Sequence, residues 1–207
     1  MHLPDGLVPL ELALAGYAGS ALLTGLALAR IKRLPDPRGE LPRAAMLTTV
    51  FFAASALSIP VPPTSVHLML TGLMGVMLGW FAVPAILVGL FLQAVLFGHG
   101  GLTTLGLNGL ILCLPALVGF AIWRGAGARW PDPAALIAGG GAVLLALAIF
   151  AGIVLLGMPA ALDAGAERAA LAVFLLAHLP LVLAEGVIVV VLLRVLRRIE
   201  PALVPHG

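Results

Sequence analysis

The sequence predicts an all-α polytopic membrane protein. Of its 207 residues, 62% are hydrophobic and only 10% are charged, whereas soluble domains average about 25% charged residues. The apolar residues form long continuous blocks, while a transmembrane β-barrel would alternate apolar and polar residues. This composition excludes a water-soluble globular domain and a disordered chain. The single cysteine excludes a disulfide scaffold and a Cys-x-x-Cys motif.

We expect about seven transmembrane helices in one integral membrane domain covering residues 1–207. A helix needs about 20 apolar residues to cross the hydrocarbon core of a membrane. The apolar blocks predict helices over 7–29, 44–59, 66–79, 83–97, 102–123, 134–156 and 169–193. Three prolines (Pro60, Pro62 and Pro63) stop the second helix, and Gly79 with Pro84 separates the third from the fourth. The third is short for a full span.

The basic residues predict the orientation, because Lys and Arg concentrate in cytoplasmic loops. With seven spans, ten of the eleven basic residues fall on one side, and Arg168 is the exception. We therefore expect the N-terminus outside the cytoplasmic membrane and the C-terminus inside. Residues 1–6 lack the basic region of a signal peptide. The bulky His2 disfavours removal of the initiator methionine, so retention of Met1 is expected.

A chain that starts Met-His can offer three nitrogens to one ion: the terminal amine of Met1, and the amide and ring of His2. Together they favour a planar arrangement, which suits Ni(II) and Cu(II), and a fourth nitrogen would complete the square. His67 begins the third predicted helix on the same outer side and could supply it. The alternatives are a solvated His2 and an interfacial His67 bonded to a backbone carbonyl.

Three further polar residues inside or beside the spans require an explanation. His99 lies in a glycine-rich loop before Asn108, where it either lines an ion path or belongs to a rigid connector. His178 and Glu185 lie seven residues apart, on one face of the last helix. They are either functional groups or an interhelical lock, made by a His–Glu pair or by Glu185 with the backbone.

Four segments together resemble the CbiM/NikM family, the substrate-binding S components of energy-coupling factor (ECF) transporters for cobalt and nickel. They are MHLPDG (1–6), SVHLMLTGL (65–73), LFLQA (90–94) and GHGGLTTLGLN (98–108). His178-Leu179-Pro180 and Ala184-Glu185-Gly186 are also similar to that family. The resemblance covers about residues 1–195 and implies a six-helix S-component bundle with one added N-terminal helix.

The resemblance implies that Ni(II) or Co(II) is the transported substrate, with no organic cofactor. Its ligands would be Met1, His2 and His67, and the N-terminal segment would tuck into the bundle toward His67. Asp5 and Ser65 would orient the ligands, with His99 and Asn108 as further candidates for that role or for an ion path.

The implied partners are a transmembrane coupling (T) subunit, two ATP-binding (A) subunits and a small CbiN- or NikN-type membrane subunit. No nucleic-acid partner is expected. The sequence contains no Walker motif, so we expect a transporter subunit that is not an enzyme. Two other functions stay open: an intramembrane enzyme using His178, Glu185 and His99, and a structural subunit that transports nothing.

Overall fold

The computed structural model describes residues 2–61, 64–157 and 164–205. Its helices are α1 (Leu10–Ile31), α2 (Leu41–Ala56), α3 (Thr71–Leu78), α4 (Ala82–Phe97), α5 (Leu105–Ala126), α6 (Pro131–Gly157) and α7 (Ala164–Ile199). Two short 3-10 turns, Gly79–Phe81 and Pro201–Leu203, complete the helical structure. The strands β1 (Ser58–Val61) and β2 (Thr64–His67) pair antiparallel, and Ser58 lies opposite His67. The predicted all-α class is confirmed, with this small hairpin as an addition.

The prediction of seven membrane-spanning helices is not matched. Among the described residues, five stretches are long and apolar enough to cross a membrane, and residues 71–97 count as one of them. Helix α2 has 16 residues and α3 has eight. At 1.5 Å per residue, α3 is only about 12 Å long. The sequence missed this because residues 58–59 and 66–67, predicted as ends of the helices 44–59 and 66–79, belong to the strands β1 and β2 instead.

Helix α3 forms the buried centre of the bundle. All eight of its residues are buried, and α3 packs against α5 and α6. Glycines allow the close approach: a Cβ on Gly72 would lie 2.3 Å from the backbone oxygen of Ala138, and one on Gly75 would lie 1.9 Å from that of Ala116. Neither backbone atom can move aside cheaply, so both positions require glycine.

Helices α1 and α5 pack side by side through small residues. The Ser20 hydroxyl donates to the backbone oxygen of Gly106 at 2.6 Å. A Cβ on Gly16 would lie 2.5 Å from the Leu107 side chain. This close packing places the start of α5 beside the start of α1, which is where the N-terminal segment enters.

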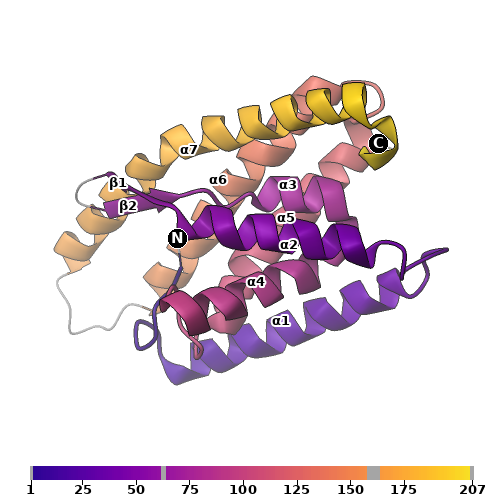
Figure 1. Cartoon of the computed structure of the whole chain (residues 1–207). Coiled ribbons are helices and arrows are strands. Elements are labelled where there is room, and N and C mark those ends of the chain that lie inside the picture. The colour runs from indigo at the N-terminus through magenta and orange to yellow at the C-terminus, as the bar shows by residue number, and fades with distance from the viewer. Residues whose placement is uncertain (1, 62–63, 158–163, 206–207) are drawn as a thin grey trace.

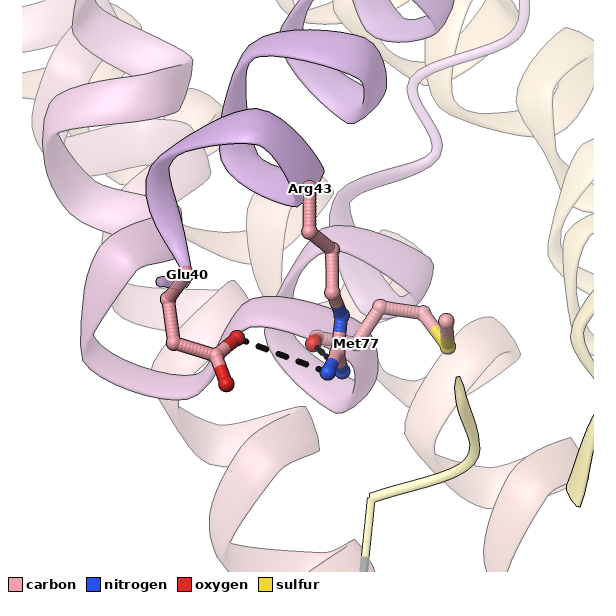
Figure 2. Close-up of polar contacts among 3 residues, drawn as sticks. All are labelled: Glu40, Arg43 and Met77. Atoms are coloured by element: carbon pink, nitrogen blue, oxygen red, sulfur yellow. Dashed lines mark hydrogen bonds and ion pairs between the residues drawn. The ribbon is translucent and has the colours of Figure 1, made fainter. Parts of the chain in front are cut away.

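The arginine-rich ends of the helices meet at the end of the bundle where the C-terminus lies, away from the hairpin and the N-terminus (Figure 1). Figure 2 shows one of their contacts. The Arg43 guanidinium donates to the Met77 carbonyl at the end of α3, and it lies 3.5 Å from the Glu40 carboxylate. A cation at a helix C-terminus satisfies a carbonyl that has no partner within the helix. This contact therefore ties the start of α2 to the end of α3.

Candidate metal centre

The N-terminal segment is clamped to the start of α5 by the Asn108 side chain. The Leu3 N–H donates to Asn108 Oδ1 at 2.8 Å, and Asn108 Nδ2 donates to the Leu3 carbonyl at 3.1 Å. The Thr104 hydroxyl donates to the same carbonyl at 2.6 Å. Leu3 and Asn108 are both buried. These bonds satisfy both backbone groups of Leu3 and fix the residue next to His2.

A second anchor lies two residues further along. Asp5 accepts hydrogen bonds from the Thr103 N–H at 2.9 Å, the Thr103 hydroxyl at 2.5 Å and the Leu102 N–H at 3.3 Å. The hydroxyl bond holds the pKa of Asp5 below its ordinary value, so the carboxylate stays charged at neutral pH. A Cβ on Gly101 would lie 2.0 Å from Asp5 Oδ1, so only glycine allows this approach.

The clamped segment brings His2 against His67. Their imidazole rings are nearly parallel, at 18°, with centroids 5.1 Å apart. With metal–nitrogen bonds of about 2.0 Å, two imidazoles on one ion have centroids roughly 4–6 Å apart. The spacing therefore fits two ligands of a single metal ion. The expected tuck of the N-terminal segment toward His67 is what the structure shows.

Both rings are in the protonation state that a metal requires. Burial lowers the pKa of His67 to about 3, and burial also lowers the pKa of His2 well below its ordinary value. Neutral imidazole binds metals, whereas the protonated ring does not. His2 Nε2 is buried and has no hydrogen-bond partner within the described structure.

The hairpin positions His67 from the other side. His67 is the last residue of β2. Its neighbour Val66 packs into the hydrophobic core, and α7 packs against this strand. After His67, the N–H groups of Met69 and Leu70 both donate to the Glu185 carboxylate, the second at 3.0 Å. Leu70 is held at φ 48°, in the left-handed region. Glu185 thus fixes the turn that joins the strand to α3.

Glu185 is therefore an interhelical lock made with backbone groups, one of the alternatives that the sequence left open. His178 is fully buried and is not paired with Glu185 by any contact the structure describes. Its Nδ1 bonds the Phe174 carbonyl at 2.8 Å, and its ring packs 4.1 Å from that of Phe174.

The remaining predicted residues lie around this centre in different ways. Met1 lies outside the described residues. Ser65 is placed by its backbone in β2, opposite Pro60, and its side chain is outside the described part of the chain. The His99 N–H donates to the Gln93 carbonyl at 3.2 Å, and its ring lies 6.1 Å from that of Phe97. Asn108 holds the backbone of Leu3, so its contact to the ligand segment is indirect.

Sequence reasoning missed the anchoring pair Thr103 and Thr104. The signal was present, since both follow the glycines of the 98–108 segment, but their partners lie about 100 residues earlier in the chain. In the part of the chain that the structure describes, no three His, Cys, Asp or Glu side chains gather as a metal cluster.

The fold and this N-terminal site define a membrane-embedded metal-transport component. The chain belongs to the CbiM family, described as "Cobalt uptake substrate-specific transmembrane region", which it matches over residues 2–203.

Relatives carry names of the same kind. The chain is 35% identical to "Cobalt transport protein CbiM 2" of Pelobacter propionicus, over 96% of this chain and 91% of that protein. It is 31% identical to "Fused nickel transport protein NikMN" of Rhodobacter capsulatus, over 81% of this chain and 48% of that protein. The chain spans about half the length of several such relatives.

Solved structures share the architecture. The crystal structure of a truncated transition metal transporter matches the whole chain with a TM-score of 0.83 and 23% identity, and all of that chain is covered. At this identity the likeness defines the fold.

Proposed function

We propose that the protein is the S component of an ECF-type importer and that it captures Ni(II) or Co(II) from the outer side of the membrane. The observation that carries the proposal is the apposition of the His2 and His67 rings at 5.1 Å. These rings come from chain segments 65 residues apart, and each is held by its own set of backbone bonds. Such preorganisation is what a selective metal site needs.

The proposed ligands are four nitrogens: the Met1 amine, the His2 amide, the His2 ring and the His67 ring. The first three belong to consecutive groups of the chain and can close chelate rings around one ion. A planar set of four nitrogens suits Ni(II), and names of relatives include both metals. Nickel is therefore the first metal to test, and cobalt is the second.

The proposed location is the cytoplasmic membrane of a bacterium or archaeon, with the N-terminus outside. Support comes from the arginines that gather at the end of the bundle remote from His2, since basic residues favour the cytoplasmic side. The proposed partners are a T subunit and two A subunits that hydrolyse ATP. A small NikN-type subunit is supported by relatives whose names describe a fused NikMN protein.

Two other functions predict different behaviour. An intramembrane enzyme would need His178, Glu185 and His99 around a common substrate, yet Glu185 is engaged by two backbone N–H groups. A structural subunit would bind no metal. The geometry of the site favours metal capture over both.

The test is calorimetric titration of the purified, untagged chain with NiCl₂ and with CoCl₂. A variant with one residue added before Met1 moves the amine out of chelating register, so tight binding is expected to disappear. Adding one residue after Gly207 is the matched control and is expected to change nothing. His67→Ala removes a direct ligand and should weaken binding at least about 100-fold, beyond the loss typical of indirect partners.

Equal affinity of the extended and unextended chains would overturn the ligand set. Absence of binding by the unmodified chain would favour the structural subunit.

A further inference from the structure

A second, separate site lies at the opposite end of the bundle, between the ends of α1 and α5. A cavity of about 490 Å³ is lined there by Arg30, Trp80, Phe120, Arg124 and three apolar or small residues (Leu117, Ala121 and Gly125). This lining includes two cations and no acidic side chain. The cavity therefore has a positive field with low-polarity walls.

Each of the two guanidiniums lies over an aromatic ring of the lining. Arg30 Cζ lies 5.2 Å from the Trp80 ring centroid, and Arg124 Cζ lies 5.5 Å from that of Phe120. The two rings meet edge to face at 6.4 Å. Both arginines therefore line the cavity next to an aromatic ring, and this contact favours the rotamers in which they face it.

Neither arginine has a carboxylate partner in the described residues. The ion pairs found there join Arg43 to Glu40 and Arg194 to Asp132. Two guanidiniums that line one cavity without a described carboxylate partner are suited to a phosphate group, which each can bind through paired N–H donors. A zwitterionic choline headgroup would add a cation to a cavity that offers it no anion.

Apolar side chains continue from the cavity along both helices. On α1, Leu22 and Leu26 precede Arg30 at intervals of four and share its face. On α5, Leu114 and Val118 belong to the stripe that leads to Ala121 and Gly125. All four apolar side chains are exposed. A ligand with a phosphate head and hydrocarbon tails would contact both the arginines of the cavity and the exposed apolar side chains beside it. A free phosphate ion would contact only the arginines.

We propose that this cavity binds the phosphate of an anionic phospholipid between Arg30 and Arg124, with the acyl chains lying along the exposed leucine and valine strips of α1 and α5. Basic pockets between transmembrane helices bind such headgroups in other membrane proteins. The site is independent of the metal centre, which lies at the other end of the bundle.

The test is native mass spectrometry of the delipidated full chain in detergent, titrated with phosphatidylglycerol and, separately, with phosphatidylcholine. Phosphatidylglycerol is expected to bind at least about 10-fold more tightly, since each arginine near a lipid phosphate strengthens binding roughly five-fold. The double variant Arg30→Gln with Arg124→Gln should lose about 30-fold in phosphatidylglycerol affinity, and each single variant about five-fold. Millimolar inorganic phosphate is expected not to displace the lipid.

The matched control is Arg33→Gln with Arg129→Gln, which removes the same charge from exposed positions outside the cavity. It should leave the affinity nearly unchanged. Nickel titration of every variant reports whether the fold is intact. Equal binding of both lipids, an equal loss in the control, or displacement by inorganic phosphate would each overturn the proposal.

Discussion

Asn108→Ala should release the N-terminal segment without touching a proposed ligand. The side chain makes two hydrogen bonds to the buried backbone of Leu3. After truncation the Leu3 carbonyl keeps the hydrogen bond from the Thr104 hydroxyl, but the Leu3 N–H loses its described acceptor. An unpaired buried N–H costs about 1–3 kcal/mol, and the lost second bond adds about 1 kcal/mol. The clamped state is therefore destabilised by roughly 2–4 kcal/mol.

Metal affinity follows the fraction of molecules in the clamped state. A loss of 2–4 kcal/mol corresponds to a dissociation constant raised by up to about 30- to 700-fold. Competition between the purified chain and a chromogenic chelator for Ni(II) measures this change. Asn108→Asp keeps an acceptor for the Leu3 N–H and loses the donor, so an intermediate affinity is expected. If Asn108→Ala bound nickel as tightly as the starting chain, the clamp would have no part in metal capture.

Three further substitutions separate the anchors from the ligands. Gly101→Ala places a Cβ 2.0 Å from the Asp5 carboxylate, so nickel affinity in the chelator assay should fall. The control is Gly141→Ala, whose Cβ meets nothing closer than 3.7 Å; it should bind nickel normally. Glu185→Ala leaves two backbone N–H groups without their acceptor, and each unpaired group costs about 1–3 kcal/mol of stability. Thermal unfolding in detergent should therefore show a lower Tm, with a smaller drop for Glu185→Gln. An unchanged Tm would refute the lock. His178→Phe removes the imidazole but keeps an aromatic ring, and calorimetry should show unchanged nickel affinity; lost affinity would place His178 among the ligands.

Composition and the long apolar blocks predicted most of the fold. Every predicted helix overlaps an observed helix over more than half of its length, because long apolar blocks have few alternatives in a membrane. The third overlaps least. The hairpin was not predictable in this way. Its segment, residues 58–67, is apolar and rich in β-branched residues and proline, and a short apolar run does not distinguish strand from helix.

The sequence indicated that His2 and His67 lie close together, and the structure shows their rings 5.1 Å apart. Their binding of a metal stays a prediction. The partners of Asn108, Asp5 and Glu185 were not predictable from the sequence, because they lie between 97 and 116 residues away. Most of these partners are backbone N–H groups, which every residue except proline has, so the sequence does not single them out.

X-ray absorption at the nickel K edge of the loaded protein tests the central claim most directly. The proposed centre predicts four-coordinate planar nickel with nitrogen donors only, two of them imidazoles, and one imidazole fewer in the His67→Ala variant. A six-coordinate shell dominated by oxygen, unchanged by that substitution, would contradict it.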